Sequence, residues 1–412
     1  NVIKIDDSGG YYEVFQDGAE TKLEKAKITL DDCLACSGCI TSAESVLITM
    51  QTHEELYNVL KSNKQARQEG RVDEVKTVVV SIAPQSRASI AARYNLTPQQ
   101  VFRRMTHFFQ SLGVDYVFDT SFSQDFSLLE SARESPSMNK TNKSKGFEDS
   151  SLPMLASSCP GWICYAEKTH GFILPYISQT KSPQQIMGSI VKDYFAKKIG
   201  VMPNNIYHVG IMMCYDKKLE ASRTDFFDEK YQTRDVDCVI TTVEVIDMFE
   251  EQNYNIKESP ESYLHSLTKT TQDGQLLRSS GSASGGFLEF ILEYSARELF
   301  GITEIDVERA KGVMVKTGRN KDFKEVILEV EGEPLLKFAS AYGFRNIQNL
   351  VRKIKNGNMQ YHYIEVMACP SGCINGGGQL KPSETVPIKE WINEVNNVYR
   401  SVDALSPEQN EV

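Results

Sequence analysis

The feature that most constrains the fold of this chain is the alternation of short β-branched runs with stretches of helical periodicity. Thr77–Ile82 (T-V-V-V-S-I) has the pattern of a buried strand, and Asp115–Asp119 has that of a second one. Between them, Thr97–Leu112 has the pattern of a helix with a threonine cap followed by proline. Strands joined through a helix run parallel, so this order predicts an α/β fold with mainly parallel sheets flanked by helices.

The same alternation continues along the chain. Further strands are expected at Met154–Ser157, Ile206–Met213, Cys238–Thr242, 312–316, 324–330 and 362–367, and further helices at about 183–199, 243–251, 287–298 and 344–356. Two polar segments, 131–150 and 254–286, lack this periodicity. We expect both to be surface insertions that are mobile at least in part.

The first part of the chain is short and rich in turns. It carries a cysteine cluster, then Ala43–Met50, which reads as a short strand, and then a helical pattern over 52–69. This change of pattern predicts an N-terminal domain over 1–72 and a two-lobed α/β domain over 73–412, with approximate lobes 73–240 and 241–412.

Composition excludes several classes of protein. The formal net charge of −10 repels phosphate backbones, so we expect no nucleic-acid partner. No apolar run reaches the roughly 18 residues of a membrane span, and no leader opens the chain, so we expect a cytoplasmic protein. Nine cysteines, an odd number in tight local groups, argue against a disulfide framework and indicate metal sites.

The first cysteine group has the spacing C-x₂-C-x₂-C, in the segment D-D-C-L-A-C-S-G-C-I-T-S, with Cys33, Cys36 and Cys39 as the thiols. This is the spacing of [4Fe–4S] ligation, which normally adds a fourth cysteine from elsewhere. Zinc is the alternative, but zinc sites usually pair two C-x-x-C hooks and no second hook is present. The candidates for the fourth ligand are a cysteine upstream of Asn1, which we favour, and His53, Cys164 and Cys238.

A second constellation is spread over three segments: S-S-C-P-G-W, M-M-C-Y-D-K-K-L-E and E-V-M-A-C-P-S-G-C-I-N-G-G-G-Q. Cys159, Cys214 and Cys369 each follow a predicted strand, and the carboxyl ends of parallel strands share one edge, so the three can converge. Cys373 can return to the same place after the P-S-G turn. Gly376–Gly378 would allow the backbone to approach a bulky inorganic group closely.

The alternative is that these cysteines are separate core residues, since a cysteine without a metal is commonly buried. We accept that interpretation for Cys164, which is on an expected helix, and for Cys238, which is inside an apolar strand. For the other four cysteines, the position at strand ends beside glycine and proline favours metal ligation.

These three segments together resemble the signature motifs of iron-only ([FeFe]) hydrogenases, and the resemblance covers nearly the whole chain. It includes Lys181–Gln185, Val117–Thr120 and Ser284–Gly286. More closely, the chain resembles the hydrogenase-like factors of the cytosolic iron–sulfur protein assembly (CIA) machinery, the group of nuclear prelamin A recognition factor-like proteins. The resemblance implies a hydrogenase-like fold of two lobes, plus a small N-terminal ferredoxin-like cluster domain.

The resemblance also implies function. It implies two [4Fe–4S] clusters, one on an N-terminal cysteine plus Cys33, Cys36 and Cys39, the other on Cys159, Cys214, Cys369 and Cys373. The expected role is to help deliver clusters to cytosolic and nuclear apoproteins. The expected partners are an early cluster scaffold complex, a targeting complex that includes a WD-repeat propeller, and the client apoproteins.

The departures from the hydrogenase motifs separate an assembly factor from an enzyme. Ser158 stands where hydrogenases carry a proton-relaying cysteine, and Met213 replaces a proline, while Lys217, Met212 and Met367 match hydrogenase pocket positions. A thiol has a pKa of about 8.5, whereas an aliphatic hydroxyl does not lose its proton near neutral pH, so proton relay through Ser158 should fail. We expect no catalytic residue and no hydrogenase activity; the alternative is an iron-only hydrogenase or a related redox enzyme.

Overall fold

The computed structural model describes residues 2–5, 11–14, 20–22, 42–135 and 153–409. The chain divides into two compact units, Asn1–Ser45 and Val46–Val412. The first unit holds an antiparallel sheet of three short strands, β1 (Val2–Ile5), β2 (Tyr11–Val14) and β3 (Glu20–Lys22). The cluster-forming residues predicted here, Cys33, Cys36 and Cys39, lie outside the described residues.

The first sheet of the larger unit is fully parallel and has the order β10-β7-β4-β5. Its strands are β4 (Thr77–Ile82), β5 (Tyr116–Asp119), β7 (Ile206–Met212) and β10 (Cys238–Thr241). Along β4, Val78 and Val80 pack on one face and Val79 on the other. Both faces are therefore buried, which explains why the strand is mostly apolar and shows no alternation of apolar and polar residues.

Helices cover both faces of this sheet. The core on one face includes side chains from α3 (His53–Gln68), α4 (Pro84–Tyr94), α5 (Pro98–Leu112), α11 (Thr242–Glu251) and α14 (Ile388–Arg400). The other face packs against one helical run made of α8 (Pro183–Ser189), the π-helix η5 (Ile190–Phe195) and α9 (Ala196–Ile199). The helices predicted over 52–69, 97–112, 183–199 and 243–251 are thus confirmed.

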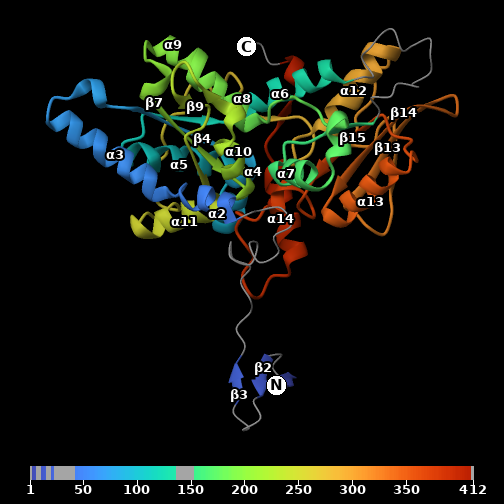
Figure 1. The fold of residues 1–412 in the computed structure, drawn as a ribbon, viewed down its shortest axis with the longest axis horizontal. Helices are drawn as coiled ribbons and strands as arrows, with labels where there is room; N and C mark the ends of the chain where they lie inside the picture. The colour runs from blue at the N-terminus through green and yellow to red at the C-terminus, as the bar shows by residue number, and fades with distance from the viewer. Residues whose placement is uncertain (1, 6–10, 15–19, 23–41, 136–152, 410–412) are drawn as a thin grey trace. The chain divides into compact units, whose positions relative to one another are not determined.

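The second sheet is mixed, with the order β12-β13-β14-β15-β6. Its strands are β12 (Met314–Thr317), β13 (Phe323–Val330), β14 (Glu333–Tyr342), β15 (Tyr363–Met367) and β6 (Met154–Ala156). The β14–β15 and β15–β6 pairs are parallel, and the β12–β13 and β13–β14 pairs are antiparallel. One face carries α6 (Ser121–Glu134) and α12 (Phe287–Phe300), the other α7 (Pro160–Thr169) and α13 (Phe344–Lys355); Figure 1 shows α12 and α13 with this sheet.

Strand β6 joins the two halves of the larger unit. It comes from the part of the sequence predicted as the first lobe, yet it pairs with β15 in the second sheet. Helix α6 likewise packs in the second core through Leu128 and Ala132. The two sheets therefore do not correspond to consecutive stretches of sequence. The predicted boundary at 72 stays a prediction, although α3 lies within the larger compact unit.

One local prediction is wrong. Residues Ala43–Met50 were expected as a strand, whereas α2 (Ser42–Thr49) is a helix. Helix α2 satisfies its backbone hydrogen bonds within itself, while a strand needs a neighbour, and no described strand pairs with this segment. Among the described residues, none of the helices combines the length and apolar character required to cross a bilayer.

The remaining elements are α10 (Asp216–Ser222), β8 (Phe227–Asp228), β9 (Thr233–Arg234), β11 (Arg278–Ser279) and β16 (Ala404–Leu405), with short 3₁₀ turns between elements.

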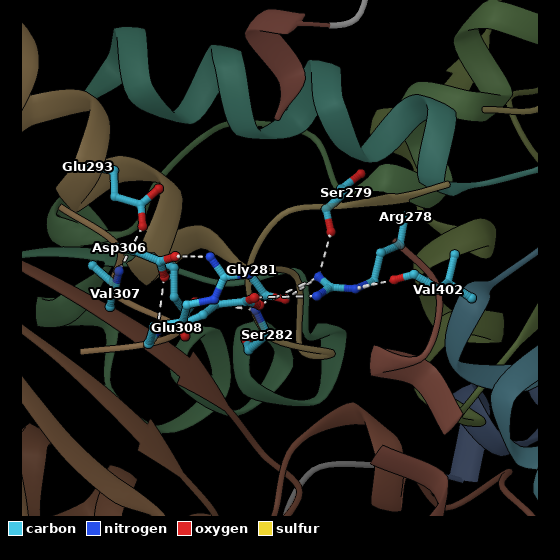
Figure 2. A network of polar contacts seen from close by, with 11 residues as sticks. Arg278, Ser279, Gly281, Ser282, Glu293, Asp306, Val307, Glu308 and Val402 are labelled. Atoms are coloured by element: carbon cyan, nitrogen blue, oxygen red, sulfur yellow. Dashed lines mark hydrogen bonds and ion pairs between the residues drawn. The ribbon is translucent and has the colours of Figure 1, made fainter. Parts of the chain in front are cut away.

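The segment 254–286 is also more deeply built in than expected. Arg278 is buried and donates to the carbonyls of Val402 (3.1 Å), Ser279 (3.0 Å) and Gly281 (3.1 Å), and it pairs with Glu308 at 3.3 Å, as Figure 2 shows. Strand β11 pairs with β16 near the C-terminal end. The prediction of a surface insertion is therefore wrong for the end of this segment. Of the other predicted insertion, 131–134 close α6 and 136–150 lie outside the described residues.

A buried histidine lies at the centre of the parallel sheet. The Nδ1 atom of His208 on β7 is 3.0 Å from the carbonyl oxygen of Asp235, which can only accept, so Nδ1 carries the proton. The Nε2 atom then accepts from the Ser81 hydroxyl at 2.8 Å. Burial lowers the pKa of His208 to about 4, because the surroundings disfavour the charged ring. The imidazole is therefore neutral in the folded protein.

This histidine predicts sensitivity to acid. The pKa of a histidine in the unfolded chain is about 6.5, which is above the pKa of His208 in the folded protein. Between these two pH values the unfolded chain binds a proton that the folded protein excludes, so the folded protein loses stability as the pH falls through this range. Between pH 7 and pH 5 we expect His208 to lower the free energy of unfolding by about 2 kcal/mol. Urea unfolding of the protein and of His208→Gln at both pH values measures this, and equal pH dependence in the two would contradict it.

Candidate metal centre

Four cysteines line a single cavity in the larger unit. Cys159, Cys214, Cys369 and Cys373 all border it, together with residues that follow β4 and β5. Cys159 comes after β6, Cys214 two residues after β7, and Cys369 two residues after β15. The cavity thus lies at the carboxyl ends of strands from both sheets, which is the position that the sequence predicted for these thiols.

Cys373 reaches the cavity through a strained turn. Ser371 and Gly372 have φ of 61° and 76°, the left-handed region that reverses the chain after Cys369. A Cβ at Gly372 would lie 2.0 Å from Ser284 Oγ, so only glycine fits. The same Ser284 hydroxyl accepts from the Cys373 backbone N–H at 3.1 Å. The turn therefore fixes the direction of the Cys373 thiol before any metal binds.

The four thiols share one electrostatic environment. Burial raises the pKa of Cys159, Cys214 and Cys369, and it raises the pKa of Cys373 to about 12. For Cys214, burial is the largest cause of the raised pKa, and repulsion from Asp216 and from the other three thiols raises it further. The Cys214 thiol is therefore within electrostatic reach of the other three. Four buried thiolates would repel strongly, so these side chains are neutral thiols unless a cation takes their charge.

The donor set fits an iron–sulfur cluster better than a single ion. Among the described residues, no group of three or more Cys, His, Asp or Glu side chains is close enough to hold one metal ion. A cubane of iron and sulfide holds its thiolates farther apart than one ion does, and four soft thiolates are the ligands that such clusters prefer. The N–H of Ala368 already points at Cys159 Sγ (3.4 Å), as a donor to a cluster ligand would.

The remaining wall of the cavity is mostly apolar, with a few polar groups. Ser158, Lys217, Met212, Met213 and Met367 all line it, in agreement with the positions singled out in the sequence. The Lys217 ammonium is buried and lies 2.6 Å from Glu220, so its charge is already compensated inside the protein.

Sequence reasoning missed two glutamines of this wall. Gln85 and Gln184 line the cavity, and within the described part of the chain the Oε1 atoms of both are buried without a hydrogen-bond donor. Their amide nitrogens are engaged, Gln85 with the carbonyl of Ala283 and Gln184 with that of Lys217. Two buried acceptors in residues of this wall are therefore left without a donor. The position of Gln85 just after β4, at the carboxyl end of a parallel strand, was the one sequence signal that could have identified it as a residue of the cavity wall.

The other candidate ligands lie elsewhere. Cys164 is buried on α7 and Cys238 is in the core on β10, where its thiol is 3.6 Å from the carbonyl of Thr52. Neither lines the cavity. His53 is 3.0 Å from Glu251. The structural role predicted for Cys164 and Cys238 agrees with these positions, and the ligands of the N-terminal cluster stay a prediction.

The glycine run after Cys373 packs against protein. A Cβ on Gly376 would lie 2.3 Å from the carbonyl oxygen of Met213, and one on Gly378 would lie 2.8 Å from Thr241. Gly378 also donates to the Met213 carbonyl at 3.0 Å. These glycines therefore bring the segment that follows Cys373 against the segment that carries Cys214, in addition to any approach to an inorganic group.

This contact predicts a difference between adjacent glycines. Gly376→Ala forces the chain away from Met213, which we expect to destabilise the protein by about 1–3 kcal/mol and to reduce bound iron. Gly377→Ala is the matched control, because its Cβ would meet only Tyr215 at 3.8 Å. Thermal unfolding and iron content of both variants test this. Equal behaviour of the two would show that the close packing is unimportant.

Comparison with known proteins places this geometry in a family. Residues 76–377 match the family described as "Iron only hydrogenase large subunit, C-terminal domain". An apo [FeFe]-hydrogenase from Chlamydomonas reinhardtii is similar in structure, with a TM-score of 0.68 and 28% identity over 82% of this chain and 88% of that one.

Similarity to two curated relatives extends over almost the whole chain. The "Cytosolic Fe-S cluster assembly factor narfl" of Xenopus tropicalis is 54% identical over 99% of this chain and 83% of its own length. The "Cytosolic iron-sulfur assembly component 3" of Mus musculus is 54% identical over 98% of this chain and 83% of its own length. The fold predicted from the motifs is confirmed. The chain belongs to the iron-only hydrogenase-like family of cytosolic iron–sulfur assembly factors.

Proposed function

We propose that this chain is an iron–sulfur assembly factor that binds two [4Fe–4S] clusters and helps to deliver clusters to apoproteins of the cytosol and nucleus. The observation that carries the proposal is the convergence of Cys159, Cys214, Cys369 and Cys373 on one cavity whose wall has a hydroxyl, Ser158, at the hydrogenase relay position. The names of the curated relatives support the same role and a cytosolic location.

The inner site is suited to hold a cluster permanently. Its four thiols sit on the ends of strands and on a fixed turn, so binding needs little rearrangement of the backbone. A bound cluster would supply the positive charge that lets these buried thiols lose their protons. Cys159 and Cys214 are each less than a tenth exposed, so a chelator has little access to their sulfur atoms, whereas Cys369 and Cys373 are partly exposed. We assign a structural role to this cluster.

The N-terminal cluster is the one we propose to be transferable. Its support is the sequence spacing of Cys33, Cys36 and Cys39, with a fourth ligand from another part of the protein. A short segment with three thiols in seven residues can release a cluster without unfolding the α/β core. The proposed partners are an early cluster scaffold, a targeting complex with a WD-repeat propeller, and the apoproteins that receive the cluster.

A redox enzyme is the second candidate. It is favoured by Lys217, Met212 and Met367, which keep hydrogenase-like positions in the cavity wall. Against it stands Ser158, because a hydroxyl cannot exchange a proton with a buried site at neutral pH as a thiol can. Hydrogen evolution by protein produced together with the hydrogenase maturation enzymes would support the enzyme over the assembly factor.

The proposal predicts the cluster content of two cysteine variants. Cys369→Ala should lose about half of the iron and acid-labile sulfide, because one of two independent sites is broken. Cys164→Ala is the matched control, since it also removes a thiol of the larger unit but one that does not line the cavity. Iron and sulfide analysis with visible absorption measures both. Full iron in Cys369→Ala, or zinc without sulfide in the unaltered protein, would overturn the assignment.

The division of labour predicts different rates of iron loss. Cys36→Ala leaves only the inner cluster and Cys369→Ala leaves only the N-terminal one. Under the same chelator, we expect iron to leave Cys369→Ala roughly tenfold faster or more, because the inner ligands are held in the core. Release followed by absorbance at several chelator concentrations measures the two rates. Faster loss from Cys36→Ala would reverse the assigned roles.

A further inference from the structure

A groove of about 890 Å³ lies on the second sheet's side of the molecule, between α13 and the turn that joins β12 to β13. It shares no lining residue with the cysteine cavity. Figure 1 shows α13 and β13 near each other in this part of the fold. No role in cluster binding accounts for it, so its chemistry can be considered by itself.

The groove is lined by cations in a protein of net charge −10. Arg319, Arg345, Arg352 and Lys353 all border it and are exposed. Within the described part of the chain, none of these four makes an ion pair. Four positive charges that repel one another and form no ion pair favour the binding of an anion.

Nearby acidic groups are engaged with other partners. Asp322 and Glu325 flank Phe323 in the sequence. Asp322 accepts from the Ser371 backbone N–H at 2.8 Å, and Glu325 accepts from the Tyr361 hydroxyl. These hydrogen bonds hold the wall of the groove in place, and within the described residues neither carboxylate forms an ion pair with the four cations. The ammonium of Lys353 lies over the ring of Phe323, 5.7 Å from its centroid.

One of the cations sits where helix electrostatics disfavours it. Arg345 is the second residue of α13, close to the positive end of the helix dipole, where Asp or Glu would be stabilising. An anion bound in the groove would be attracted by Arg345 and by the helix end together. The position of this arginine is thus unfavourable for the free protein and favourable for a complex with an anion.

The walls are set before any ligand binds. Asn320 Nδ2 donates to Asn346 Oδ1 at 2.8 Å, and Asn346 donates to the Tyr342 carbonyl at 2.8 Å, which ties the turn to the helix. Phe323 packs edge-on against Tyr361 with ring centroids 6.3 Å apart. The groove therefore combines a rigid aromatic base with a row of cationic and amide side chains.

The spread of charge identifies the class of ligand. Arg345, Arg352 and Lys353 lie within nine residues of helix, and the eight steps from first to last cover about 12 Å along its axis, which matches roughly four residues of extended peptide. A single phosphate would need its donors gathered at one point, and the net charge of −10 opposes a long nucleic-acid strand. We propose that this groove binds an extended, acidic peptide segment of a partner protein, with carboxylates on the arginines and an apolar residue on Phe323.

The test uses the full chain and a fluorescein-labelled octapeptide of alternating Asp and Glu around one central Phe. We expect the affinity for this peptide to fall as the salt concentration rises. We also expect the Arg345→Glu/Arg352→Glu variant to bind the peptide at least roughly tenfold more weakly than the unaltered protein. Lys61→Glu/Lys64→Glu is the matched control, because these exposed lysines change the net charge equally on a different helix. Fluorescence anisotropy gives the affinities, and circular dichroism checks that both variants are folded.

Several outcomes would overturn the proposal. They are an absence of binding by the acidic octapeptide, equal weakening in the Lys61→Glu/Lys64→Glu control, and equal binding of the Asn/Gln counterpart of the peptide. Tighter binding of a single-stranded DNA octamer would assign the groove to nucleic acid instead. Displacement of the peptide by inorganic pyrophosphate at comparable concentration would assign it to a small phosphate ligand. Retention of cluster content in Arg345→Glu/Arg352→Glu would separate this groove from the cluster sites.

Discussion

The candidate site of the larger unit depends on four thiols whose surroundings all disfavour the charged form. Cys159, Cys214, Cys369 and Cys373 are drawn together at strand ends, where burial and mutual repulsion raise their pKa values. Met212, Met213 and Met367 also line their cavity, whose wall is mostly apolar, so few polar groups are present to share that charge. Four neutral thiols can share this cavity, but four thiolates would repel one another, so the site is suited to an inorganic core that takes their charge.

Both sheets are needed to build this site. Cys214 follows a strand of the first sheet, whereas Cys159 and Cys369 follow strands of the second. Because β6 comes early in the chain but pairs in the second sheet, the two halves are interlocked and the site cannot be separated from either. The glycine contact with Met213 and the Arg278 network then hold the late segments of the chain against the early ones.

Much of this arrangement could be predicted from the sequence, because the informative patterns are local. Strands such as β4 are mostly β-branched runs, and the cysteines that follow strands were correctly expected to converge. Helix α4 was not predicted, since almost all its residues are buried and it has no polar face to produce a period. The segment at 254–286 was misjudged because its polar residues find buried partners, such as the carbonyls around Arg278, that come from distant sequence. Orphan acceptors such as Gln85 Oε1 have no sequence signature at all.

The most direct test of the account is a crystal structure with anomalous diffraction measured at the iron edge and above the zinc edge. The account predicts iron density enclosed by the sulfur atoms of Cys159, Cys214, Cys369 and Cys373, with the size of a four-iron cubane and with all four thiolates bonded to it. Zinc in that position, or iron density with one or more of these thiols turned away, would contradict it.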